Sequence, residues 1–206
     1  MSKITAIEIQ KNDKERCSLY IDETFFSGVS METVIKNHLK VGDEIEKNKL
    51  AEILHVSEKE KALSKALNYL SKTIKTKKQV KDYLIKKGFY DEIVFFVLDK
   101  LSEYGLINDR EYSIRYVETY SKTQGRKLIE YKLMAKGVRK EDILFAFEET
   151  ANKVDNFTNA YNLAIKHLKG KERTRENLAK TYRYLAGKGY LFEDIERVFS
   201  KIKEEE

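Results

Sequence analysis

The stretch Leu84-Ile85-Lys86-Lys87-Gly88-Phe89 decides the fold, because the chain contains the same pattern three times. Its counterparts are Leu133-Met134-Ala135-Lys136-Gly137-Val138 and Leu185-Ala186-Gly187-Lys188-Gly189-Tyr190. In each, a leucine stands four residues before a glycine, a lysine directly before it and an apolar or aromatic residue directly after it. This pattern is typical of a helix that ends on a left-handed glycine, with the next residue folded back onto the last turn.

Other features recur with these glycines, which lie 49 and 52 residues apart. Each glycine is followed by an acidic residue and an isoleucine, in the pairs Glu92-Ile93, Asp142-Ile143 and Asp194-Ile195. Negative charge is favourable in the first turn of a helix, so a new helix is expected to begin at each pair. The spacing is typical of small helical repeats, and we predict three helices in each repeat.

Several helix starts are also marked by capping residues. Ser57, with Glu60 three residues later, forms a capping-box pattern that predicts the start of the first repeat. Thr76 is the expected cap of the second helix in that repeat, and Asn108 is the expected cap that opens the second repeat. The first helix of repeat two then carries a stripe of tyrosines, Tyr112, Tyr116 and Tyr120.

The N-terminal segment has a different period. Residues 4–9 and 17–21 alternate apolar and polar side chains, which predicts two strands joined by a polar turn at 11–15. Asp22-Glu23, followed by Thr24-Phe25-Phe26, indicates a second hairpin. Two short helices are expected over 31–38 and 44–54.

We therefore predict a mainly α protein, with tandem three-helix repeats that form an elongated curved rod and a small N-terminal β-hairpin cap. The predicted boundaries are 1–56 for the β-rich cap with its short helices, 57–107 for repeat one, 108–153 for repeat two and 154–206 for repeat three.

The predicted rod can be tested by small-angle X-ray scattering. Since each repeat in such an array contacts only its neighbours, repeats one and three should lie apart. The radius of gyration should then clearly exceed the ~17 Å expected for a compact globule of this length. A value near that figure would contradict the rod.

Composition excludes several classes of protein. No stretch of the 206 residues is long and apolar enough for a membrane helix, and the N-terminus lacks the apolar core of a secretion signal. The single cysteine, Cys17, has no partner for a disulfide within the chain. We expect a cytoplasmic monomer that does not associate with membranes.

Positive charge is concentrated in three windows, 72–87, 122–140 and 166–188. Together they hold twenty-two basic and four acidic residues, although the whole chain has a net charge of only +6. Three separate basic windows, one in each repeat, favour a polyanionic partner. The alternative is that these windows are ordinary solvated helix faces.

Catalytic motifs are absent from the sequence. Gly170-Lys171-Glu172 lacks the other residues of a phosphate loop, and the three histidines are dispersed without zinc-ligand spacing. Cys17 lies on a predicted strand and is interpreted as a packed thiol rather than a nucleophile. We predict that the chain is not an enzyme and binds no cofactor or metal.

Several tyrosines in or near the basic windows offer rings that could stack on nucleobases. They are Tyr83, Tyr116, Tyr120, Tyr131, Tyr182 and Tyr184. The spacing of Tyr116 and Tyr120 favours core positions instead. Tyr182 and Tyr184 cannot share one helix face, so one of the two is expected to be exposed beside Arg183.

The chain resembles the RecX family over nearly its whole length. The resemblance is carried by Leu101-Ser102-Glu103-Tyr104-Gly105-Leu106-Ile107-Asn108-Asp109, by Lys86-Lys87-Gly88-Phe89 and by Gly125-Arg126-Lys127-Leu128-Ile129. The segments Ile4-Thr5-Ala6-Ile7-Glu8 and Arg16-Cys17-Ser18-Leu19-Tyr20-Ile21-Asp22 are similar to the N-terminal extension of members from Gram-positive bacteria. Arg126 departs from the pattern, because many members have proline there.

The resemblance implies a regulator, mainly an inhibitor, of the recombinase RecA in recombination, DNA repair and the SOS response. Such a protein would bind RecA filaments on single-stranded DNA and limit their growth, ATP hydrolysis and strand exchange, with binding to double-stranded DNA left open. Two alternatives remain. One is a free-standing nucleic-acid-binding protein, and the other is an adaptor whose basic faces meet acidic proteins.

The residues expected to contact DNA or the RecA filament are basic residues in the three windows. They are Lys77, Lys78 and Lys81 in repeat one, Arg126, Lys127 and Lys132 in repeat two, and Arg173, Arg175, Lys180 and Arg183 in repeat three. Their expected role is phosphate contact and electrostatic docking, without readout of base sequence.

Overall fold

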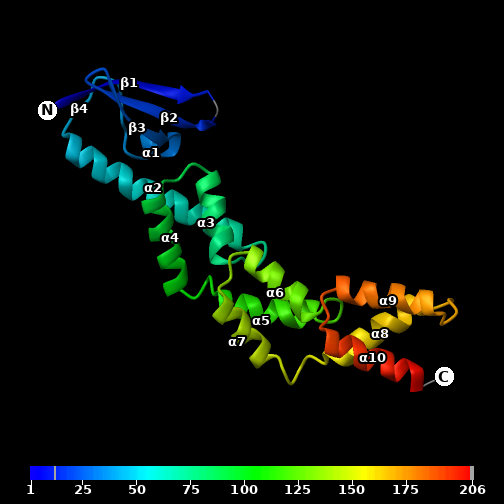
Figure 1. The fold of residues 1–206 in the computed structure, drawn as a ribbon. Coiled ribbons are helices and arrows are strands. Elements are labelled where there is room, and N and C mark those ends of the chain that lie inside the picture. The colour runs from blue at the N-terminus through cyan, green and yellow to red at the C-terminus, as the bar shows by residue number, and fades with distance from the viewer. Residues whose placement is uncertain (12, 205–206) are drawn as a thin grey trace. The chain divides into compact units, whose positions relative to one another are not determined.

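The computed structural model describes residues 1–11 and 13–204 (Figure 1). Its contacts divide the chain into two compact units. The first unit is Met1–Thr73 with Val80–Glu103, and the second is Ile74–Gln79 with Tyr104–Glu206. The first unit therefore holds the β-rich cap and most of repeat one, and the second holds repeats two and three with residues 74–79.

The N-terminal cap is an antiparallel sheet in the order β3-β2-β1-β4. Its strands are β1 (Ser2–Gln10), β2 (Asp13–Ile21), β3 (Thr24–Ser30) and β4 (Glu44–Ile45), and α1 (Met31–Lys36) follows β3. Asp22 and Glu23 both have positive φ, the conformation that a two-residue hairpin turn requires. The pairing of β1 with β2 and of β2 with β3 confirms the two predicted hairpins, and the predicted strand residues Ile4, Leu19 and Ile21 lie in the core. The polar turn expected over 11–15 is wrong in its bounds, because residues 13–15 belong to β2; residue 12 lies outside the described residues.

The helix α2 (Lys47–Leu70) differs from the prediction, because it runs through Ser57 without a break. Residues 44–45 belong to β4, so the helix expected over 44–54 begins at Lys47 and continues into repeat one. Leu50 and Leu54 pack into the core of the cap, and Ala62 and Ala66 of the same helix are also buried. The predicted helix start at Ser57 is therefore wrong, and the boundary between residues 56 and 57 falls inside a helix.

Three helices form each repeat, as predicted. Repeat one consists of the end of α2 with α3 (Lys77–Lys86) and α4 (Asp91–Glu103). Repeat two consists of α5 (Asp109–Tyr120), α6 (Arg126–Ala135) and α7 (Lys140–Glu149), and repeat three of α8 (Asn156–Leu168), α9 (Arg175–Gly187) and α10 (Phe192–Glu204). The mainly α fold with a β-hairpin cap is confirmed.

The glycine turn between the second and third helix has the same geometry in all three repeats. Gly88, Gly137 and Gly189 have φ values of 84°, 83° and 84°. In each turn, the residue after the glycine donates its backbone N–H to the carbonyl of the leucine four residues before that glycine, as in Phe89 to Leu84. The apolar residue after each glycine is buried, which completes the helix stop that the sequence predicts.

Candidate nucleic-acid and filament interface

Residues 74–79, which comprise the end of the loop before α3 and the first residues of α3, contact the glycine turn of repeat two within the second unit. The Thr76 hydroxyl donates a 2.7 Å hydrogen bond to the Lys136 carbonyl, and it also accepts from the Gln79 N–H as the predicted helix cap. The side chain of Lys78 lies over Gly137, so closely that a Cβ on this glycine would come within 2.3 Å of it. Part of the basic window 72–87 therefore lies at a contact with the glycine turn of the next repeat, and we call such a contact a joint.

The loop between α5 and α6 makes the corresponding joint with repeat three. Here the contacts are between main-chain atoms: Gly125 N–H donates to the Lys188 carbonyl at 2.9 Å, and Lys127 N–H donates to the Gly189 carbonyl at 3.0 Å. A Cβ on Gly189 would lie 2.4 Å from the backbone nitrogen of Leu128. In both joints, the first residues of the second helix of one repeat, α3 or α6, lie against the glycine turn of the following repeat.

One carboxylate contacts residues 74–79, and a second forms ion pairs within repeat two. Asp109 accepts the Lys77 N–H at 2.8 Å, and burial raises the pKa of this carboxyl above its ordinary value. The buried Asp142 accepts from Arg110 at 2.8 Å and from Arg139 at 3.1 Å. Burial acts to raise the pKa of Asp142, but the hydrogen bonds from the two arginines outweigh it and hold the pKa below its usual range.

The predicted site residues of repeats one and two fall into two groups. Lys77, Lys78 and Lys127 are exposed at the joints. Arg126 is held by Glu130, at 2.8 Å, and its guanidinium lies 4.7 Å from the centre of the Phe147 ring. The remaining two, Lys81 and Lys132, are partly buried, and the Lys81 ammonium lies over the Phe95 ring. The exposed lysines are thus better placed to contact a phosphate than Arg126.

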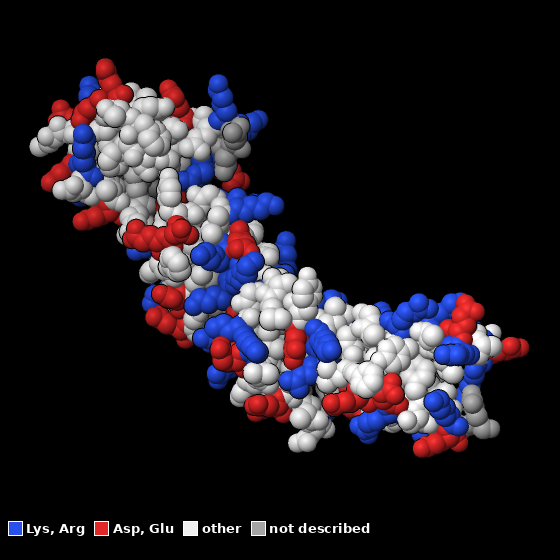
Figure 2. Space-filling view, in the orientation of Figure 1, with Lys and Arg blue, Asp and Glu red and all other residues white. Residues whose placement is uncertain are grey.

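The predicted residues of repeat three do not occupy the positions of their counterparts. The helix α9 has 13 residues against 10 in α3 and α6, so its first turn has no equivalent in the other repeats. Arg173 donates to the Ile202 carbonyl at 3.0 Å, near the end of α10, and Lys180 pairs with Glu176 at 2.7 Å. Arg175 and Arg183 are exposed, and Figure 2 shows Lys and Arg side chains along α9.

Most of the candidate tyrosine rings already contact another aromatic ring of the protein. Five of the six rings lie against another aromatic ring within their own unit, in the pairs Tyr83–Tyr69, Tyr116–Tyr112, Tyr120–Tyr116, Tyr182–Phe199 and Tyr184–His167. Tyr182 and Tyr184 are both partly buried, since both pack against the core that α9 shares with α8 and α10. The expectation that one of them is exposed beside Arg183 is therefore wrong. Tyr131 makes no ring contact within the described residues and is 66% exposed.

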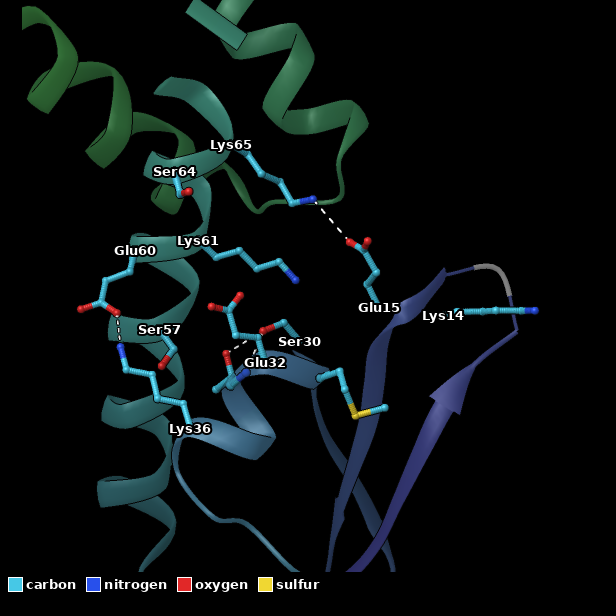
Figure 3. Close-up of a pocket in the computed structure, with 12 residues that line it drawn as sticks. Lys14, Glu15, Ser30, Glu32, Lys36, Ser57, Glu60, Lys61, Ser64 and Lys65 are labelled. Atoms are coloured by element: carbon cyan, nitrogen blue, oxygen red, sulfur yellow. Dashed lines mark hydrogen bonds and ion pairs between the residues drawn. The ribbon is translucent and has the colours of Figure 1, made fainter. Parts of the chain in front are cut away.

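The cavities of the first unit offer no catalytic arrangement. A cavity of about 580 Å³ between the cap and α2 is lined mainly by lysine, glutamate and serine side chains (Figure 3). Lys36 pairs with Glu60 at 2.7 Å and Lys65 with Glu15 at 3.6 Å, so the charges of the lining largely compensate one another. The buried Cys17 has a pKa raised by desolvation, which disfavours the reactive thiolate.

Within residues 1–11 and 13–204, no group of His, Cys, Asp and Glu side chains could hold a metal ion. Over the same residues, no helix is long and apolar enough to cross a bilayer.

Comparison with known proteins now gives the family. The model of the regulatory protein RecX N-terminal domain matches residues 2–46, and that of the first three-helix domain of RecX matches residues 62–101. The regulatory protein RecX of Clostridium tetani is 35% identical over 98% of this chain and 95% of its own length. The chain belongs to the RecX family. The RecX of Clostridium perfringens strain SM101 is 32% identical over 100% of this chain and 99% of its own.

Solved RecX structures share the fold as well. A crystal structure of regulatory protein RecX has a TM-score of 0.68 and 28% identity, and the match covers 97% of this chain and all of that one. The RecX of Lactobacillus salivarius has a TM-score of 0.66 and 26% identity over 72% of this chain and 98% of its own. Both the sequence and the fold therefore support membership of the RecX family of regulatory proteins.

Proposed function

We propose that this chain regulates RecA, mainly as an inhibitor, by binding RecA filaments on single-stranded DNA in the cytoplasm. It would limit filament growth, ATP hydrolysis and strand exchange during recombination and DNA repair. Membership of the RecX family supports RecA as the partner, and the basic windows support contact with a polyanion.

The observation that carries this proposal is the position of exposed cations in every repeat. Lys77 and Lys127 lie at the starts of α3 and α6, next to the two joints, while Arg175 and Arg183 lie on α9. Among the described residues, none of these four side chains forms an ion pair. Since an unpaired cation gives up no internal partner when it binds phosphate, these four are the ones we assign to the DNA in the filament.

ATP hydrolysis by RecA on single-stranded DNA tests the function. We expect the protein to act as a monomer and to lower the rate of ATP hydrolysis at well below one copy per RecA subunit. Few copies should suffice, because one copy at the end of a growing filament blocks its extension. A free-standing nucleic-acid-binding protein would instead reduce hydrolysis only when enough copies are present to cover the DNA. That second outcome would overturn the proposed action on RecA, and only the alternative of a nucleic-acid-binding protein would stand.

The salt dependence of DNA affinity distinguishes the arginines of repeat three that contact DNA from the one that stabilises the fold. Replacing Arg175 and Arg183 by alanine should lower the slope of log affinity for single-stranded DNA against log salt by about one to two, because each phosphate contact on a single strand contributes ~0.7. The variant Arg173→Ala is the matched comparison. Since Arg173 holds the carbonyl of Ile202, its loss should lower the melting temperature and change the slope less. Equal slopes in all three proteins would remove α9 from the interface.

A further inference from the structure

An uncharged patch lies on the outward face of α6, next to an exposed lysine. The patch is Tyr131 and Met134, and the lysine is Lys127; the three follow one another at four and three residues and so share one side of the helix. Ile129 and Leu133 are buried on the opposite side. Tyr131 and Met134 are 66% and 51% exposed, and Figure 2 shows uncharged surface over α6 with Lys and Arg side chains beside it.

The ring of Tyr131 is available for a planar ligand. The other five candidate tyrosines each lie against a neighbouring ring, whereas both faces of Tyr131 lack an aromatic contact within the described residues. Its position in repeat two corresponds by the glycine spacing to Asp82 in repeat one and Arg183 in repeat three. Repeat two is therefore the repeat that presents an aromatic ring at this place.

The charge around the ring favours an anionic ligand. Lys127, one turn before Tyr131, is exposed and forms no ion pair among the described residues. The acidic neighbour Glu130 is already bound by Arg126 at 2.8 Å, so its charge is compensated. A planar apolar ring beside a free ammonium is the combination that proteins use for single-stranded nucleic acid, where the base stacks and the cation binds the phosphate.

We propose that Tyr131 stacks on an unpaired nucleobase of single-stranded DNA while Lys127 binds an adjacent phosphate. The inference rests on the proposed function in taking DNA as the ligand, and it adds a preference for single over double strands. In a duplex, the faces of the bases are stacked on each other and are closed to the ring. The stacking does not depend on base sequence, because every base has a π-face.

Binding to a fluorescent oligothymidylate, followed by anisotropy, tests the stacking. Tyr131→Ala should weaken binding about 5- to 160-fold, which corresponds to the roughly 1–3 kcal/mol that a stacked base contributes, and Tyr131→Phe should bind like the unchanged protein. The salt slope should stay the same in Tyr131→Ala, since no charge is lost, but should fall in Lys127→Ala. Tyr90→Ala is the matched control, because Tyr90 is 70% exposed and lies in the first unit.

An oligonucleotide of abasic sites isolates the contribution of the base. The unchanged protein and Tyr131→Ala should bind this abasic strand equally. The chain contains no tryptophan, so Tyr131→Trp introduces a single reporter whose emission should be quenched by oligothymidylate and much less by duplex DNA.

Three outcomes would overturn the stacking. The first is unchanged oligothymidylate binding in Tyr131→Ala with inhibition of RecA retained, which leaves the proposed function standing. The second is normal DNA binding by Tyr131→Ala with lost inhibition, which assigns the patch to a protein surface. The third is an unchanged protein that neither binds single-stranded DNA nor inhibits RecA, which overturns the proposed function as well.

Discussion

Replacing Gly189 by alanine should lower the free energy of unfolding of the second unit by about 3 kcal/mol or more. Two costs combine in this variant. Gly189 has a φ of 84°, which costs an alanine roughly 1 kcal/mol or more. The added Cβ would also lie 2.4 Å from the Leu128 nitrogen, and such overpacking costs about 1–3 kcal/mol when the backbone must shift.

Gly88→Ala is the matched control for this prediction. Gly88 has the same φ of 84° and the same hydrogen bonds within its own turn, but a methyl group added at this residue would meet no atom within 4 Å. Its alanine variant should therefore lose only about 1 kcal/mol, the conformational cost alone. Urea unfolding followed by far-UV circular dichroism measures both losses. Equal losses in the two variants would show that the joint at Gly189 contributes nothing to stability.

Arg16→Met should destabilise the first unit by about 3 kcal/mol, the cost of leaving a buried charge without its partner. Arg16 on β2 contacts Glu58 on α2 at 3.1 Å, and the two side chains are only 12% and 11% exposed. Arg16 binds the Oε2 atom of Glu58, and the Oε1 atom is buried with no hydrogen-bond partner among the described residues. Thermal unfolding of the single variant measures the loss.

A double variant and an exposed pair provide the controls for Arg16. Adding Glu58→Leu to Arg16→Met removes the unpaired charge and should restore most of the lost stability. Lys36→Met breaks the exposed pair with Glu60, which also links α1 to α2, and should leave the unfolding midpoint unchanged. If Arg16→Met behaved like Lys36→Met, the pair at Arg16 would be no stronger than a surface contact.

Local signals predicted the turns and most of the caps. The glycine turns depend on φ and on the residues directly beside them, so short patterns suffice to place them. Asn108 caps α5, and Thr76 caps α3, because each side chain hydrogen-bonds within its own turn. A repeat boundary can therefore be predicted from the sequence where such a turn and such a cap mark it.

The start of repeat one was mispredicted because a distant contact outweighs a local one. Ser57 and Glu60 have the spacing of a capping box, but residues before them are already helical. Leu50 and Leu54, four residues apart, are covered by the sheet of the cap, and this burial extends the helix toward the N-terminus. The buried sheet residues in this core come from β1, β2 and β3, which all end at or before Ser30, so the sequence pattern around Ser57 does not reveal the contact.

The sequence shows where the basic windows lie, but it shows less well which of their cations are bound within the protein. Charge counts placed the basic windows, but they cannot show which cations are already bound inside the protein. Arg126 is held by Glu130 four residues later, a spacing that could have signalled the pair. Arg173 is held by a carbonyl 29 residues away, and nothing in the local sequence predicts that contact.

The joint between repeats two and three is built from main-chain hydrogen bonds, and this choice of atoms affects how the sequence can evolve. Backbone N–H and carbonyl groups are the same in almost every residue, so the bonds from Gly125 and Lys127 restrict side chains only where a glycine is needed for close approach. The second helix of repeat three has 13 residues against 10 in repeat two, and a main-chain joint is compatible with that difference. Under this arrangement, selection can rework the outward surface of one repeat without a compensating substitution in its neighbour.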